Sequence, residues 1–324
     1  MAEITYREAI AVGIAQEMAR DPLVVLIGED VGASGGVFKA TAGLFDQFGP
    51  RRVCDTPISE QAILGAAMGA AMTGLRPIAE IMFGDFLSVC HDMVANQIAK
   101  ARYMTAGQLH VPLVIRFGNG GGLRFGAQHS QSVESWLMAV PGLKVVVPST
   151  AADVIGLMAA AVRDPDPVMV LEEKVLYPLK GEVPDGEHVD ELGVAVVRRP
   201  GRDATVVALG TMVHRALAAA DLLSADGIEI EVVDLRSLVP LDVTTVGRSV
   251  MKTAHLFTVE ENPRLCGWGA ELASIVADEY FSELDGPIRR ITSPHIPLPA
   301  ADALEDATIP SIERVVEEVR KGLD

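Results

Sequence analysis

Short runs of β-branched and other apolar residues alternate along the chain with longer segments whose apolar residues recur at helical spacing. This alternation is typical of parallel strands joined by crossover helices. The runs are almost continuously apolar, which indicates strands that are covered on both faces. The pattern predicts strands at 23–27, 77–82, 112–117, 144–147 and 167–171, and a second set at 204–209, 228–233, 256–259 and 288–291.

The two sets of strands are separated by a segment of different composition. Residues 177–200 are rich in proline, glycine and charged residues, and no apolar period persists across them. We therefore predict two α/β domains, 1–180 and 201–324, joined by a linker at 181–200. Within the first domain, the alanine- and glycine-rich segment 62–75 is shorter than the roughly 20 residues that span a bilayer. It predicts a buried helix.

Charge and cysteine content narrow the functional classes. The 324 residues carry 27 Lys and Arg against 44 Asp and Glu, a net charge of −17 that would repel nucleic acid and anionic membranes. The three cysteines are too few and too far apart for a disulfide framework or a CxxC metal site. The first residues lack the pattern of a secretory signal or a transit peptide. A cytoplasmic protein is expected.

The sequence contains partial matches to nucleotide-binding and nucleophile motifs, and none of these motifs fits in full. The glycine-rich stretch 118–126 follows a predicted strand, but Leu123 stands at the sixth position of GxGxxG. No Gly-Lys pair exists for a phosphate loop. Residues 32–36 satisfy the letters GxSxG, yet Glu29 and Asp30 separate them from the preceding strand, so a nucleophile elbow is not expected.

An acidic residue at the start of the small-residue helix is the candidate for chemistry. Ser59 is the predicted N-cap, and Glu60 follows it. Taken alone, Glu60 is most simply a first-turn acid that the helix dipole favours. Gly65 and Gly69 lie on one helical face, where they would let another backbone approach closely. That spacing indicates an interface.

Four segments occur in an order that carries a family resemblance: GEDVGASGGVFKATAGL, RVCDTPISEQAILGAAMGAAMTGLRPIAEIMFGDF, RFGNGGGLRFGAQHSQSVESW and PGLKVVVPST. The chain resembles, over essentially its whole length, the beta subunit of the thiamine-diphosphate-dependent decarboxylating component of 2-oxo-acid dehydrogenase complexes, including the acetoin-cleaving branch. The resemblance implies an α/β fold: a transketolase-like pyrimidine-binding domain with a parallel sheet, followed by a transketolase C-terminal-like α/β domain. The implied activity is oxidative decarboxylation with acyl transfer to lipoamide.

The same resemblance implies roles for three residues. Glu60 would hydrogen-bond the aminopyrimidine ring of the cofactor and promote its imino tautomer, which deprotonates the thiazolium carbon. Phe86 would lie against the pyrimidine ring, although ordinary core packing explains an aromatic there about equally well. His129 would act near the reacting carbonyl and the incoming lipoyl group as a proton donor.

The resemblance also implies ions and partners. No GDG segment is present to hold the magnesium ion and the diphosphate, so an alpha subunit is expected to supply that half in an α2β2 heterotetramer. The second domain is expected to dock the dihydrolipoyl acyltransferase core. A structural potassium ion is implied at Leu113, Ala161, Val162, Asp164 and Asp166, although relatives commonly carry Asn at the position of Asp166.

The sequence does not decide the substrate or exclude other classes of protein. Pyruvate, a branched-chain 2-oxo acid and acetoin are all compatible with the sequence, and residues 89–93 depart from the pattern of many pyruvate-type relatives. A half of a split transketolase and a non-catalytic scaffold subunit are the alternatives. The segments around His129 and His295 favour the dehydrogenase family over the split transketolase, and the presence of Glu60 and His129 argues against the scaffold.

Overall fold

The computed structural model describes residues 2–323, and they form two compact units. The first unit comprises residues up to Asn119 together with Trp136–Leu192. The second comprises Gly120–Ser135 and the chain from Gly193 onward. Each unit has its own sheet and its own buried apolar cluster.

The sheet of the first unit is parallel, as predicted. Its strands follow the order β6-β7-β5-β4-β2-β3, and every neighbouring pair among them is parallel. The predicted strands of this half are all present, and the missed strand β3 is only three residues long. The bounds are β2 (Val24–Gly28), β3 (Val53–Asp55), β4 (Arg76–Phe83), β5 (Val114–Asn119), β6 (Lys144–Val146) and β7 (Val168–Glu173).

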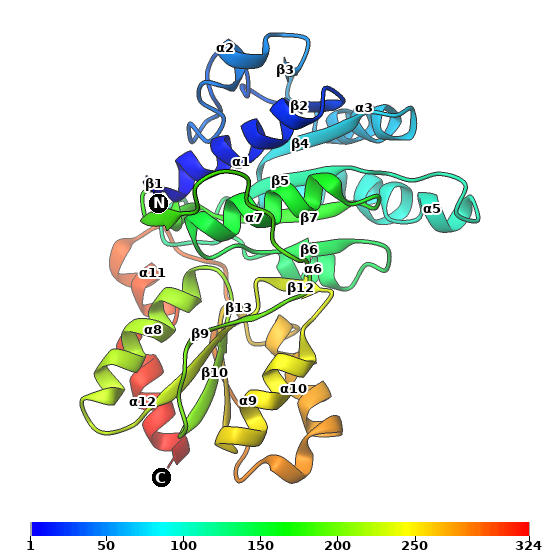
Figure 1. Cartoon of the computed structure of the whole chain (residues 1–324). Helices are drawn as coiled ribbons and strands as arrows, with labels where there is room; N and C mark the ends of the chain where they lie inside the picture. Colours follow the sequence, from blue (N-terminus) through cyan, green and yellow to red (C-terminus); the bar gives the residue numbers. More distant parts are fainter. Residues whose placement is uncertain (1, 324) are drawn as a thin grey trace. The chain divides into compact units, whose positions relative to one another are not determined.

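Helices cover this sheet (Figure 1). The helices α1 (Tyr6–Arg20) and α7 (Ala151–Arg163) pack against each other, and each begins with a reciprocal capping box. Their apolar faces lie in one cluster with the strands, so the sheet is buried as its apolar strands require. The other elements are α2 (Leu44–Phe48), α3 (Glu60–Met72), the 3-10 helices η1 (Gly84–Phe86) and η3 (Lys174–Leu176), α4 (Leu87–Asp92), the π-helix η2 (Met93–Ile98), α5 (Ala101–Met104) and α6 (Glu134–Met138).

The alanine-rich helix α3 is less buried than the sequence predicts. It packs on β4 through Ile63, Leu64, Ala67 and Ala71. Its opposite face is exposed within this chain because nothing in the described part of the chain covers its residues: Ala62, Ala66, Gly69 and Met72. The prediction of a helix is correct, and the prediction of complete burial is wrong.

The predicted linker at 181–200 contains two strands. β8 (Lys180–Val183) pairs antiparallel with β1 (Ala2–Thr5), and β9 (Val196–Arg199) pairs antiparallel with β11. Both contain charged residues and are partly exposed, as edge strands are, so neither shows a continuous apolar run. The chain passes between the units after Asn119, after Ser135 and, between β8 and β9, after Leu192.

The second unit is a second α/β sheet in the order β14-β13-β10-β11-β9. Its strands are parallel except β9 at the edge. The sheet strands are β10 (Ala204–Ala208), β11 (Ile230–Asp234), β13 (Leu256–Pro263) and β14 (Arg289–Ser293), and β12 (Ser237–Val239) follows β11 along the chain. The helices are α8 (Thr211–Ser224), α9 (Val243–Thr253), α10 (Trp268–Glu279), η4 (Phe281–Glu283), α11 (Asp302–Thr308) and α12 (Ile312–Leu323).

The last helix closes one side of the second unit. Val315, Val316 and Val319 are its buried positions, and the helix packs on α8 and β14 (Figure 1). Among residues 2–323, no helix is long and apolar enough to cross a membrane.

Candidate functional site

The candidate residues of the first unit gather at one edge of its sheet. Glu29 directly follows β2, and Asp55 ends β3 shortly before Glu60. Phe83 ends β4, and Glu173 ends β7. In parallel sheets the carboxyl ends of all strands share one edge, and ligands bind there. The topology therefore brings the acids and aromatics of separate sequence segments to one place.

Glu60 is the first residue of α3, and it is buried, with 8% of its surface exposed. Ser59 holds the N-cap position as predicted, but its side chain makes no capping hydrogen bond. Within residues 2–323, no ion pair or hydrogen bond to the Glu60 carboxylate occurs. The Glu60 oxygens are not among the enclosed, unpartnered atoms of the described chain, so this carboxylate is open to a donor from outside the chain.

The Glu60 carboxylate contributes to a raised pKa at two buried neighbours, Glu29 and Cys90. Burial raises the pKa of Glu29, and the carboxylates of Glu60 and Asp30 raise it further. Burial and the Glu60 carboxylate also raise the pKa of Cys90 to about 12. Neither neighbour could be found from the sequence, since a lone cysteine and a loop acid have no motif. Glu29 and Cys90 therefore belong to the surroundings of Glu60.

Cys90 also connects this region to Phe86. Its thiol donates to the carbonyl oxygen of Phe86 over 3.5 Å. The ring of Phe86 packs edge-on against Phe83, with centroids 5.5 Å apart, and Phe83 packs in the same way against Phe38. Phe86 is half-buried, so it is a member of an aromatic row with part of its surface still open. This geometry allows both core packing and contact with a flat ligand.

The segment that matches GxSxG is a closed loop. The amide of Gly32 donates to the Asp55 carboxylate over 2.6 Å, and Ser34 is exposed in the loop. Gly35 and Gly36 both have positive φ, a conformation that favours glycine. A nucleophile elbow requires a strand-to-helix turn, which this loop is not.

The glycine-rich stretch folds onto the second unit. The amide of Gly121 donates to Glu261 over 2.5 Å, and the amide of Gly122 donates to Glu305 over 3.0 Å. The guanidinium of Arg124 also donates to Glu305, over 2.6 Å. Carboxylates of the chain itself therefore take the amides that a dinucleotide loop would offer to phosphate.

His129 lies further along this same loop. It is partly exposed, and its amide donates to the carbonyl oxygen of Gly126 over 3.4 Å. The neighbouring Ser130 is buried, and its hydroxyl has no hydrogen-bond partner among the described residues. The imidazole is thus carried by a loop that Glu261 and Glu305 hold in position.

Cationic side chains occupy the oxygens of the predicted potassium site. Arg76 donates to the carbonyl oxygens of Val162 and Asp164, over 2.8 and 3.3 Å. Lys144 pairs with the Asp164 carboxylate, and Arg102 pairs with Asp166 over 2.6 Å. The carbonyl of Leu113 accepts from Val168, and that of Ala161 accepts from Asp164. A positive guanidinium at two of the oxygens does not fit a bound cation.

No group of three or more His, Cys, Asp or Glu side chains forms a metal-binding cluster within the part of the chain that the structure describes.

Comparison with known families matches both units. The model of the transketolase pyrimidine-binding domain matches residues 2–180, and that of the transketolase C-terminal domain matches residues 193–315. The beta-2 subunit of the mitochondrial pyruvate dehydrogenase E1 component of Oryza sativa subsp. japonica is 45% identical, over 99% of this chain and 86% of that subunit. The chain belongs to the family of transketolase-like dehydrogenase beta subunits. The fold class implied by the sequence is thereby confirmed.

Other members of this family of beta subunits differ in the substrate that their names state. The beta subunit of the acetoin:2,6-dichlorophenolindophenol oxidoreductase of Bacillus subtilis is 47% identical, over 97% of this chain and 95% of that subunit. The 2-oxoisovalerate dehydrogenase beta subunit of the same organism is 45% identical, with 94% of both chains covered. A solved structure of a split-gene transketolase, an inactive beta4 tetramer, has a TM-score of 0.81 and 26% identity, covering 99% of this chain and 98% of that one.

Proposed function

We propose that this chain is the beta half of a thiamine-diphosphate-dependent enzyme that decarboxylates a 2-oxo acid, or cleaves acetoin, and passes the acyl unit to lipoamide. The observation that supports it is Glu60: a buried carboxylate without a hydrogen-bond partner in residues 2–323, at the carboxyl edge of a parallel sheet. Its relatives at 45–47% identity are dehydrogenase and oxidoreductase beta subunits.

In this proposal Glu60 holds a proton at the ring nitrogen of the aminopyrimidine. Burial disfavours a lone carboxylate, and sharing a proton with the ring relieves that cost. Glu29 adds a second buried acid beside it, which keeps the surroundings receptive to a proton. Phe86 offers the open part of its ring to the flat pyrimidine. When bound, the cofactor supplies the nucleophilic carbon and stabilises the negative charge that decarboxylation leaves.

His129 is proposed to move a proton at the substrate. A protonated imidazole can donate to an oxygen on which negative charge develops. Its partly exposed position leaves it accessible to a substrate or to a lipoyl group. The hydrogen bonds from the glycine-rich loop to Glu261 and Glu305 restrict the loop that carries it.

An alpha subunit is proposed to complete the site in an α2β2 assembly and to hold the diphosphate and its magnesium ion. The described residues contain no acidic metal cluster that could do so. Large apolar side chains on this unit are exposed in the isolated chain, to 82% for Ile58, 85% for Tyr103 and 75% for Met104. Side chains of this size are usually buried, so they indicate a partner surface. The dihydrolipoyl acyltransferase core is proposed to dock on the second unit.

The substrate is one of three chemical types. Relatives named for pyruvate, acetoin and 2-oxoisovalerate are 45%, 47% and 45% identical, so identity does not separate the types. The likeness to a split transketolase is weaker, at 26% identity. A panel of pyruvate, 2-oxoisovalerate, acetoin and a ketose phosphate, assayed on the co-purified alpha and beta chains with an artificial electron acceptor, separates all four.

The Glu60→Gln variant tests the proposal directly. Glutamine keeps the shape but cannot share the proton, so turnover should fall about 100-fold or more, while co-purification with the alpha chain stays intact. Glu182→Gln, an exposed glutamate of the same unit, is the matched control and should retain full turnover. Full activity of Glu60→Gln in the intact assembly would contradict the proposed function.

Calorimetry tests which of the two chains is needed to bind thiamine diphosphate. The beta chain alone should bind thiamine diphosphate weakly or not at all, whereas the assembly with alpha should bind it tightly and only with magnesium. Tight, magnesium-independent binding to beta alone would show that the alpha chain is not needed to hold the diphosphate.

A further inference from the structure

A hollow of about 620 Å³ lies on the second unit, at the carboxyl ends of β13 and β14. These two strands are parallel neighbours, and both lead directly into the residues that line the hollow. The outer carboxyl ends of such strands are where open α/β sheets bind ligands. We call it the basic pocket, because Arg264, Arg290, His295 and Arg314 line it and no acidic side chain does.

Two of the arginines that line the basic pocket carry uncompensated charge. Arg290 is neutralised, since it donates to both oxygens of the buried Glu260 over 2.8 and 2.7 Å. The guanidinium of Arg264 donates only to the carbonyl oxygen of Arg290, over 3.3 Å. Neither Arg264 nor Arg314 forms an ion pair within residues 2–323. On a chain with a net charge of −17, a pocket with free guanidinium groups and no carboxylate is a local exception.

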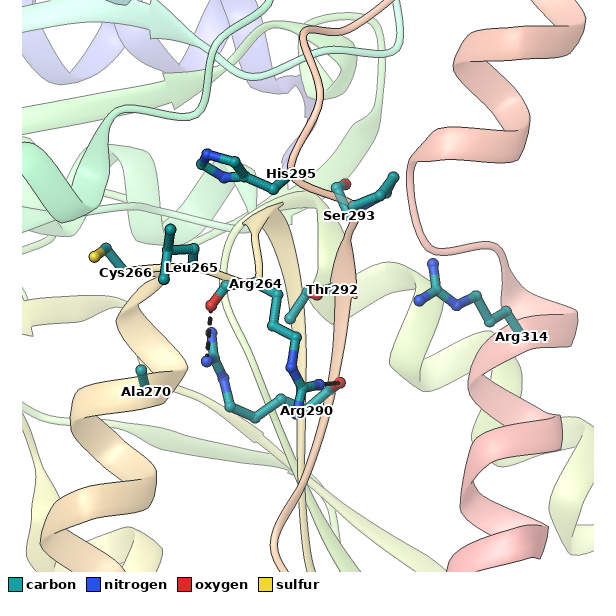
Figure 2. Close-up of a pocket in the computed structure, with 10 residues that line it drawn as sticks. Arg264, Leu265, Cys266, Ala270, Arg290, Thr292, Ser293, His295 and Arg314 are labelled. Atoms are coloured by element: carbon teal, nitrogen blue, oxygen red, sulfur yellow. Dashed lines mark hydrogen bonds between the residues drawn. The ribbon is translucent and has the colours of Figure 1, made fainter.

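A buried hydroxyl in the pocket lacks a partner. Ser293 ends β14, is 3% exposed and lines the hollow, yet its Oγ has no hydrogen-bond partner in the described chain. Figure 2 shows Arg314 reaching from α12 toward β14, where Ser293 lies, with His295 beyond the strand end. Buried hydroxyls are normally hydrogen-bonded, so this one indicates a ligand atom that accepts from it.

The scaffold holds these groups in place. Val315 and Val316 follow Arg314 in α12 and lie on the buried face of this helix. The helix therefore cannot turn Arg314 away from the pocket without exposing them. Arg264 and Arg290 exchange hydrogen bonds with each other's carbonyl oxygens, and the second of these is 2.9 Å long. The donors of the basic pocket are therefore pre-positioned before any ligand binds.

We propose that the basic pocket binds the phosphate group of a small phosphorylated molecule. Arginine guanidinium groups and a serine hydroxyl are the donors that suit a tetrahedral dianion. The volume exceeds what a phosphate ion fills, so an organic part can be accommodated beside it. A carboxylate would use the same donors with less charge, and the experiment separates the two. The site involves only residues of the second unit and does not depend on Glu60.

Calorimetry on the full chain, and on the chain co-purified with alpha, tests the proposal at constant ionic strength. Glycerol phosphate and inorganic phosphate are the probes, and acetate is the carboxylate arm. We expect one phosphate site per chain, and Arg314→Gln and Arg264→Gln should each raise its Kd about ten-fold or more, since a charged hydrogen bond is lost. Arg320→Gln, on the same helix and paired with Asp226 outside the pocket, is the matched control and should not change Kd.

A chemical footprint gives a second readout. Cys266 is exposed and lines the pocket, whereas Cys54 is half-buried and lies on the other unit. Glycerol phosphate should slow alkylation of Cys266 by a maleimide, measured by peptide mass spectrometry, without changing Cys54. Arg314→Gln should abolish that protection.

Several outcomes would overturn the proposal. Equal affinity in all variants would show binding elsewhere, and acetate binding as tightly as phosphate would show a carboxylate site. Binding to the chain alone that disappears in the assembly with alpha would show that a protein surface covers the pocket. Thermal unfolding of each variant checks that it is folded. The Glu60→Gln variant should bind phosphate normally, so failure here and failure of the proposed function are distinguishable.

Discussion

A buried triad of charges in the first unit allows a sharp test of how its sheet is held together. Arg116 on β5 is 2% exposed and lies between Glu80 on β4 and Glu172 on β7. It forms a two-bond contact with Glu172, both bonds 2.6 Å long, and an ion pair with Glu80. The hydroxyl of Tyr177 donates to Glu172 over 3.1 Å. The carboxyl ends of these strands carry the candidate site.

Replacing the central arginine removes the only cation of the triad. Arg116→Met leaves two carboxylates buried side by side, and breaking a buried pair in this way costs about 3–5 kcal/mol. That cost lowers the folded-to-unfolded ratio roughly 10²- to 10⁴-fold and the unfolding midpoint by about 6–20 °C. The triple variant R116M/E80M/E172M removes all three charges and should recover at least half of the loss, since apolar replacements of similar volume are often neutral.

Urea unfolding followed by tryptophan fluorescence measures these free energies. Trp136 belongs to the first unit and Trp268 to the second, so a Trp268→Phe background reports the first unit alone. Arg102→Met is the control in the same unit: Arg102 pairs with Asp166 at 2.6 Å, its side chain is 48% exposed, and the effect should stay below about 1 kcal/mol. A loss below about 1 kcal/mol for Arg116→Met, or no recovery in the triple variant, would refute the reasoning.

Two further predictions concern pH and ions. Glu17 is buried; burial raises its pKa, but hydrogen bonds from Arg163, Gln16 and Arg20 outweigh this and leave the pKa lowered. Its stabilisation is therefore full above the unfolded value of about 4.3 and is lost as pH falls through the lower native value, so the deficit of Glu17→Gln in urea unfolding should be constant from about pH 6 to 8 and shrink below about pH 4.3. A deficit that persists unchanged at pH 3 would disprove it. Because Arg76 occupies the carbonyl oxygens of Val162 and Asp164, the thermal midpoint should be the same in potassium and sodium chloride, and a higher midpoint in potassium alone would show a bound ion.

The strands and the family could be predicted from the sequence because both depend on local pattern. Runs such as 168–171 and 204–208 are buried on both faces, so every residue in them is apolar or small and the run is visible without a partner. The segment that leads into Glu60 is likewise contiguous, and the roles of Glu60, Phe86 and His129 remain predictions that the described geometry accommodates. The short β3 and the edge strands β8 and β9 have no such run, so periodicity alone misses them.

What the tertiary structure decided involves residues that lie far apart in the chain. Glu261 and Glu305 bind the amides of Gly121 and Gly122, 140 and 183 residues away, and this places the loop of His129 on the second unit rather than on the first. Arg264 and Arg314 meet at one pocket only because β13 and α12 flank β14. Apolar burial leaves a periodic trace within each segment, whereas the partner of a charge is fixed by packing between segments. The sequence alone therefore determined the elements and the family, and the folded chain determined which carboxylates and guanidinium groups are paired and which are left for a ligand.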